Sequence, residues 1–83
     1  MSAVRILVIA ATRDPHRQAE ALRAALGLTL RGARVEVAVA EPLLTPLAQR
    51  AADTLRSFGH TVRAPAPSEL DALARADRVE VWT

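Results

Sequence analysis

The residues best suited to chemistry follow the first apolar run of the chain. Thr12, Arg13, His16 and Arg17 surround an Asp-Pro pair that is typical of a helix start, because Pro fits the first helical position and Asp accepts hydrogen bonds from free N–H groups. A hydroxyl, cationic side chains and the N–H groups of a helix N-terminus can together bind an anion. The loop is therefore a candidate anion site, and a solvated polar turn is the alternative.

Other catalytic chemistry lacks the residues that it needs. The chain has no cysteine and no lysine, and no serine stands in a nucleophile-elbow context. No glycine-rich phosphate loop is present, and the carboxylates form no acid–base pair. His16 and His60 are interpreted as surface residues. The sequence predicts no catalytic residue, no metal site and no cofactor, and it favours a protein that is not an enzyme.

Length and composition favour a small domain that self-associates. The 83 residues, 51% of them hydrophobic, are expected to form one α/β domain over 1–83. A chain of this size buries only about 60% of the surface that its unfolded form exposes, so small domains commonly rely on disulfides, metals or oligomerisation. With no cysteine and few metal-ligand residues, oligomerisation is the aid that remains. We expect a homodimer or a higher homo-oligomer.

The charge pattern argues against nucleic-acid and membrane partners. All eleven basic residues are arginine, which explains the sequence pI near 11.0 although the formal charge is only +2. The arginines are interleaved with acids and form no basic stripe. The apolar run 6–11 is too short to span a bilayer, and a helix start follows it where a signal peptide would have a cleavage site. The sequence predicts a cytoplasmic protein.

Alternating strand and helix patterns predict a parallel sheet joined by right-handed helical crossovers. The apolar, β-branched run 4–10 is typical of a strand buried on both faces. Gly32 and Gly59 are predicted left-handed helix ends. The expected elements are strands at 4–10, 34–40, 61–64 and 78–83, and helices from Pro15 to about Arg31, at about 46–58, and from a cap at Ser68 to about Ala76.

The order of the strands follows from their polarity. The first strand is expected inside the sheet, and the two strands that contain Val-Glu-Val are expected at its edges. This gives the flavodoxin-like order 2-1-3-4, with helices on both faces and a ligand crevice between strands one and three, at the loops 11–17 and 64–68. Gly27 is predicted to bring the first helix close to the sheet. The predicted apolar stripes are Ala19, Leu22, Leu26 and Leu30, and Leu47, Ala51, Leu55 and Phe58.

Two stretches of the chain carry a family resemblance. The opening strand, the Asp-Pro turn and a helix ending in LRGARVEV, together with the closing ELDALARADRVEVW, resemble the DsrE/DsrF-like family of small sulfur-relay proteins. The resemblance covers roughly 4–40 and 68–82. It implies a compact oligomer and a persulfide-forming cysteine after the third strand, where this chain reads APAPSEL at 64–70. The resemblance therefore implies a short, cysteine-free member that acts as a non-catalytic binding or structural subunit, with a sulfur-relay protein as its partner.

Two hypotheses about function remain open at this point. The first is this DsrE-like oligomeric module, and the second is a flavodoxin-like domain that binds an anion or a nucleotide with weak or no enzymatic activity. Trp82 also has two interpretations, since an indole at the end of a strand either covers the local core or contacts a partner. Self-association is expected through the surface around Trp82 or through the flat side of the first helix that carries Ala21, Ala24, Ala25 and Leu28.

Overall fold

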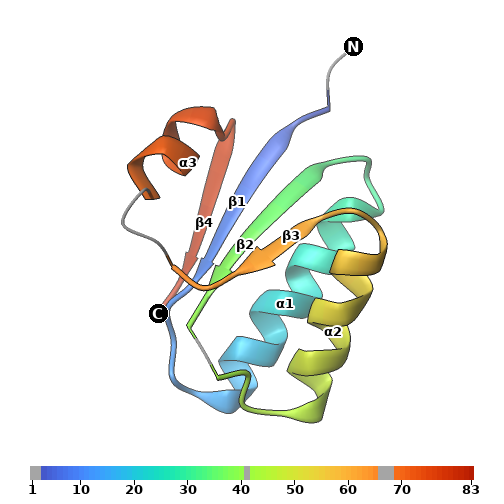
Figure 1. Cartoon of the computed structure of the whole chain (residues 1–83), viewed down its shortest axis with the longest axis vertical. Coiled ribbons are helices and arrows are strands. Elements are labelled where there is room, and N and C mark those ends of the chain that lie inside the picture. The colour runs from blue at the N-terminus through green and yellow to red at the C-terminus, as the bar shows by residue number, and fades with distance from the viewer. Residues whose placement is uncertain (1–2, 41, 66–68) are drawn as a thin grey trace.

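The computed structural model describes residues 3–40, 42–65 and 69–83. Four strands alternate with three helices along these residues, as the sequence pattern predicts (Figure 1). The strands are β1 (Arg5–Ala10), β2 (Arg34–Val39), β3 (Thr61–Arg63) and β4 (Arg78–Trp82). The helices are α1 (Pro15–Thr29), α2 (Pro46–Ser57) and α3 (Glu69–Arg75).

Local signals set the helix ends where the sequence predicts them. The Asp14 carboxylate accepts hydrogen bonds from the backbone N–H groups of His16 and Arg17 at 2.8 and 3.2 Å, and Thr45 Oγ1 accepts one from Ala48 N–H at 3.0 Å. The residues that follow α1 and α2 include Gly32 at φ 85° and Gly59 at φ 86°, a conformation that glycine adopts without a Cβ clash. The predicted cap at Ser68 lies outside the described residues.

The sheet is entirely parallel, and its strand order is β3-β2-β1-β4. The interior position of β1 is confirmed, whereas the predicted order 2-1-3-4 and the edge position of β2 are wrong. Arg34 and Glu36 alternate with valines in β2, and this alternation suggested an edge. In the structure, the alternation reflects a strand inside the sheet with one thinly covered face.

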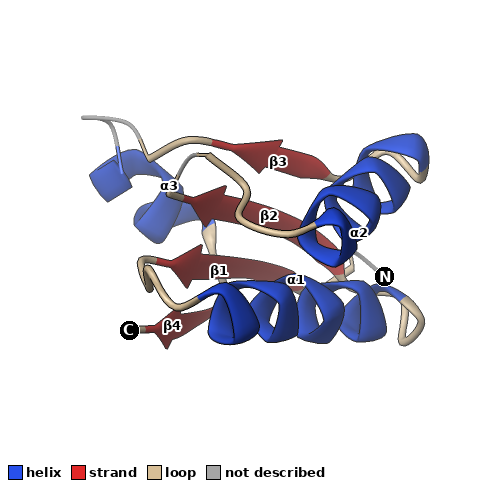
Figure 2. Cartoon of the chain, turned by 90° about the horizontal axis from the view of Figure 1, so that it is seen from below, coloured by secondary structure: helices blue, strands red, loops and turns tan. Residues whose placement is uncertain are grey.

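The strand order explains how the helices are distributed. Crossovers between parallel strands are right-handed, so successive moves in one direction place their helices on one face. The chain moves from β1 to β2 to β3 in one direction and then returns past both inner strands to β4. Figure 2 accordingly shows α1 and α2 on one side of the row of strands and α3 on the other, so the prediction of helices on both faces is confirmed.

The main core lies between the sheet and the α1–α2 layer. Leu22 of α1 and Leu55 of α2 are fully buried there, against the alternate strand residues that point toward the two helices. These strand residues are Ile6, Val8 and Ala10 of β1, Val35, Val37 and Val39 of β2, and Val62 of β3.

The predicted apolar stripes are buried at Ala19, Leu22, Ala51 and Leu55, but not at their C-terminal ends. Leu30 is 84% exposed and Phe58 is 63% exposed, whereas the alanines at 48 and 52 are fully buried. Gly27 is also exposed, and a Cβ added there would meet nothing within 4 Å, so its predicted role in close approach to the sheet is wrong. The buried alanines 21 and 25 allow this approach, because a methyl side chain keeps the helix near the strands.

The second face of the sheet has much less cover. Helix α3 has seven residues and buries Ala72, and it packs closest to β1 among the strands. Under it, Leu7 of β1 and Ala38 of β2 are buried. Val79 and Val81 of β4 point to the same face and remain 39% and 59% exposed. One face is therefore a closed core, and the other is partly open.

Candidate functional site

The reversal of strand order that marks a ligand crevice falls between β1 and β4. The predicted crevice between strands one and three is therefore wrong, because β3 lies at the far edge of the sheet. The described part of the 64–68 loop, Ala64 and Pro65, follows β3 and is not at the reversal. At the true reversal, the loop after β1 meets the end of β4, where Ala11 N–H donates to the Trp82 carbonyl at 2.9 Å.

Thr12 and Asp14 use their polar groups to shape the loop after β1. Thr12 is buried, and its Oγ1 accepts a hydrogen bond from Asp14 N–H at 3.1 Å. The Asp14 carboxylate in turn occupies the N-terminus of α1, where two backbone N–H groups donate to it. A bound anion would have to compete with this carboxylate for the same groups and against its negative charge.

Arg17 and Trp82 join the start of α1 to the end of β4. Arg17 Nε donates to the carbonyl of Thr83 at 3.0 Å, and its guanidinium carbon lies 5.4 Å from the centroid of the Trp82 ring. This distance is within the range of a cation–π interaction. The indole is half-buried and packs against the main core. This placement agrees with the interpretation of Trp82 as a cover for the core, and its contact with a partner stays a prediction.

Arg13 and His16 lie apart from the Arg17–Trp82 contact. His16 is exposed, whereas Arg13 and Thr12 both line a cavity of about 280 Å³, together with Gln18. The structure therefore does not gather the four predicted ligand residues around one point. Two of them, Thr12 and Arg17, make contacts within the chain that stabilise the loop.

Gln18 is a buried polar residue that sequence reasoning missed. Its Nε2 donates to the carbonyls of Ala40 and Pro42 at 3.1 and 3.4 Å, and its Oε1 accepts from Leu44 N–H at 2.7 Å. These bonds fix the connection between β2 and α2 against α1. A glutamine within a helix resembles an exposed residue in the sequence, so no local signal reveals this role.

An ion network attaches α3 to the sheet. Arg63 of β3 bonds Glu36 of β2 through Nε at 2.8 Å and Nη2 at 2.7 Å. It also bonds both carboxylate oxygens of Glu69 in α3, at 2.6 and 3.1 Å. Arg75 adds a longer contact to Glu36 at 3.8 Å. The bidentate geometry suits the planar guanidinium, and it links two strands and a helix through one side chain.

The network keeps Arg63 charged. The hydrogen bonds that Arg63 donates to Glu69 raise the pKa of Arg63 above its usual range; burial opposes this shift, and the Glu36 carboxylate adds to it. A raised pKa stabilises the fold at every pH below the ordinary arginine value, so this contribution is complete at neutral pH. The Arg-Val-Glu pattern of β2 is the available sequence signal for this network, but the same pattern is also typical of a solvent-facing edge strand.

Strand β4 is one edge of the sheet. Because the Trp82 carbonyl faces β1, and alternate residues direct their backbone groups to opposite sides, Val79 and Val81 direct theirs outward. The side chain of Val81 lies beside that of half-buried Ile9 on the α3 face. Among the described residues, this edge therefore combines backbone groups that pair with no other strand with exposed apolar side chains.

The described residues contain neither a metal-binding cluster nor a membrane-spanning helix. Within 3–40, 42–65 and 69–83, no three His, Asp or Glu residues gather in a way that could hold a metal ion. No helix in these ranges has the length and hydropathy of a membrane span.

No protein-family model, curated protein or solved structure matches the chain.

Proposed function

We propose that this protein is a non-catalytic binding subunit that forms a homodimer by antiparallel pairing of β4 with β4 of a second copy. The observation that carries the proposal is the edge of β4, where Val79 and Val81 remain exposed because the short helix α3 does not cover them. Unprotected strand edges pair readily with another chain. A two-fold axis pairs each edge once and closes the assembly.

The charges of β4 select one register for this pairing. If the axis passes through Val79, Arg78 stands opposite Glu80 of the second copy, and Glu80 stands opposite Arg78 of that copy. If the axis passes through Glu80, two glutamates face each other, which is unfavourable. Because Val79 directs its backbone outward, Arg78 and Glu80 fall in the pairs without hydrogen bonds, where side chains are closest. Within one copy the two residues already approach at 3.3 Å, and each would gain a second partner.

The two surfaces that the sequence suggested for self-association are used inside the chain. The alanines at 21 and 25 are buried in the layer where α1 packs on α2. Trp82 packs on the core and on Arg17. These contacts make the β4 edge a better candidate than the other two surfaces for binding a second copy of the chain.

A role in sulfur relay would rest on a partner protein. Persulfide transfer needs a thiolate that attacks the donor, and this chain has no cysteine. In the DsrE-like interpretation, the homodimer is the scaffold and the partner holds the sulfane sulfur. Incubation with a sulfane-sulfur donor should then leave the mass of this chain unchanged in mass spectrometry, and a stable gain of one sulfur would contradict this view.

Sedimentation equilibrium of charge variants tests the dimer and its register. Arg78→Glu should weaken association about tenfold or more, because it replaces two attractive cross-strand pairs with repulsive ones. The double variant Arg78→Glu with Glu80→Arg should restore it, since the swapped charges are again complementary.

Arg31→Glu is the matched control, because Arg31 is an exposed arginine beyond the end of α1. It should leave the dimer unchanged. A monomer for the unmodified chain at high micromolar concentration would overturn the proposal. Equal dissociation constants for Arg78→Glu and Arg31→Glu would overturn the register.

A further inference from the structure

A cavity of about 300 Å³ opens on the α3 face at the amino ends of β1 and β2. It lies at the opposite end of the strands from the loop that carries Thr12 and Arg17. Its walls come from β1, β2, α3 and the segment after α2. The lining side chains that matter for binding are Arg5, Arg34, Glu36, Phe58, His60 and Arg75.

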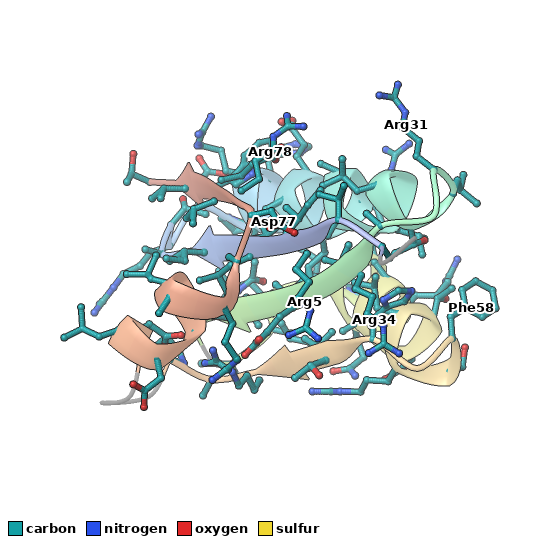
Figure 3. All side chains as sticks on the ribbon, turned by 90° about the horizontal axis from the view of Figure 1, so that it is seen from above. Arg5, Arg31, Arg34, Phe58, Asp77 and Arg78 are labelled. Carbon is teal, nitrogen blue, oxygen red and sulfur yellow. The ribbon has the colours of Figure 1, made fainter. Side chains whose placement is uncertain are left out.

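Arg5 and Arg34 form a like-charge pair across two adjacent strands. They are direct partners in the parallel register of β1 and β2, so their side chains leave the sheet on the same face. Figure 3 shows both at the amino end of the sheet, between α3 and the end of α2 where Phe58 lies. Within the described residues, neither guanidinium has a hydrogen-bond or ion-pair partner. Both side chains are exposed, and like charges on neighbouring strands repel each other, so an anion bound between them would relieve this repulsion.

The surrounding charges do not neutralise the pair. Glu36 is the one carboxylate among the described lining residues, and it is engaged by Arg63 at 2.7 Å. Asp77 accepts a hydrogen bond from the backbone N–H of Arg5 at 2.8 Å, but Figure 3 shows it toward β4. Arg75 brings a third guanidinium from α3, held by a long 3.8 Å contact to Glu36. The cavity therefore keeps an excess of positive charge.

His60 adds a donor to the same wall. Its Nδ1 accepts a hydrogen bond from Val35 N–H at 3.3 Å. In the neutral ring this places the proton on Nε2, which makes that nitrogen a donor. The cavity thus combines three guanidinium groups and an imidazole with the apolar side chains of Leu7, Phe58 and Ala72.

We propose that this cavity binds the phosphate group of a small phosphate monoester. Arg5 and Arg34 come from paired positions of β1 and β2, and Arg75 of α3 lines the same cavity. Such an arrangement suits a tetrahedral dianion with several terminal oxygens better than a planar carboxylate. The volume is at the lower end of the range for small-molecule sites, and the apolar wall offers room for an organic group beside the phosphate. This inference is independent of the proposed dimer, because β4 lines no part of the cavity.

Titration by NMR in a buffer free of phosphate tests the site. Inorganic phosphate and phenyl phosphate should each give saturable shifts of the Arg5 and Arg34 Nε–Hε signals and of the Val35 and His60 amides. Phenyl phosphate should bind tighter because of the apolar wall. Sodium chloride at equal ionic strength should give no saturable shift. Succinate should bind at least tenfold more weakly than phenyl phosphate.

Neutral variants identify the residues that bind. Arg5→Gln and Arg34→Gln should each weaken phosphate binding at least tenfold, whereas the control Arg31→Gln should leave it unchanged. Without ligand, Arg34→Gln should melt at the same temperature as the unmodified protein or higher, because it removes the like-charge repulsion. At the same concentration of phenyl phosphate, the melting temperature of the unmodified protein should rise more than that of Arg34→Gln.

Several outcomes would overturn the proposal. Shifts that grow linearly with phosphate, or that match those from chloride, would show general ionic screening. Equal loss of binding in Arg31→Gln would place the anion elsewhere. Tighter binding of succinate than of phenyl phosphate would exclude the phosphate monoester.

Discussion

The α1–α2 face and the α3 face of the same sheet are attached to their helices by different forces. On the first face, valines, leucines and alanines fill a core that excludes water. On the second face, a seven-residue helix buries Ala72 and is tied to the strands through Arg63, Glu36 and Glu69. Apolar burial scales with area, whereas partly exposed ion pairs contribute little each. The first face therefore supplies most of the stability, and the second is left partly open.

This difference follows from how the chain crosses the sheet. The two crossovers beside α1 and α2 each reach a neighbouring strand, so both helices lie directly over the sheet. The third crossover spans both inner strands with a short helix, and it leaves Val79 and Val81 of β4 and the side chains of Arg5 and Arg34 exposed. The exposed Val79 and Val81 of the proposed dimer edge and the proposed phosphate cavity lie on this open face, whereas Arg78 and Glu80 of the proposed dimer lie on the other.

Removal of a core side chain should have the largest effect. Leu22→Ala, on the closed face, should lower the free energy of unfolding by about 2–5 kcal/mol, because it removes buried methyl groups and leaves a cavity. Leu70 of α3 is 78% exposed, so Leu70→Ala should change the free energy of unfolding by less than about 0.5 kcal/mol. Urea denaturation followed by circular dichroism measures both. Equal losses would mean that α3 contributes as much packing as α1.

Disruption of the ion network should have a moderate and local effect. Arg63→Ala should cost roughly 1–2 kcal/mol, since its carboxylate partners are only partly exposed and would lose a shared counter-charge. Hydrogen exchange should accelerate at the α3 amides far more than at the α1 amides.

The exposed Arg50 on α2 is the matched control, and Arg50→Ala should leave exchange in α3 unchanged. Unaltered protection of α3 in Arg63→Ala would show that apolar contacts hold this helix.

Substitution of alanine for two glycines, one within α1 and one after its end, should change the stability of the protein in opposite directions. Gly27→Ala should stabilise the protein by about 0.5–1 kcal/mol, because the residue is helical and exposed with free space around it. Gly32→Ala should cost about 1 kcal/mol, because φ 85° brings a Cβ into conflict with the backbone. Thermal melting of both variants checks the pair. A loss in Gly27→Ala would mean that α1 approaches another surface there.

Added salt should have the smallest effect on stability, and it should affect the α3 face differently from the α1–α2 face. A rise in ionic strength from about 0.1 to 1 M shortens the screening length from about 10 to 3 Å, which weakens partly exposed ion pairs. The α3 amides should lose a few tenths of a kcal/mol of protection, whereas those of α1 should hold or gain slightly. Parallel changes in both helices would remove the distinction between an ionic face and an apolar one.

The candidate sites were less predictable than the elements. The loop at Thr12–Arg17 could be located from its Asp-Pro signal, but the sequence could not show that Asp14 would occupy the helix N-terminus itself. Arg5 and Arg34 lie 29 positions apart in the chain. They become neighbours through the pairing of β1 with β2, and no local pattern encodes that register.

The sequence by itself determined the elements, because their signals are local. Asp14 and Thr45 cap helices that begin with proline, Gly32 and Gly59 end them, and the apolar run of β1 is buried wherever the strand lies. The order β3-β2-β1-β4 was decided by tertiary structure alone. The Val-Glu-Val alternation fits an edge strand as well as an inner strand with one open face. The choice depends on how far the β3–β4 crossover reaches, and on the energy of covering one face with two long helices and the other with a short one.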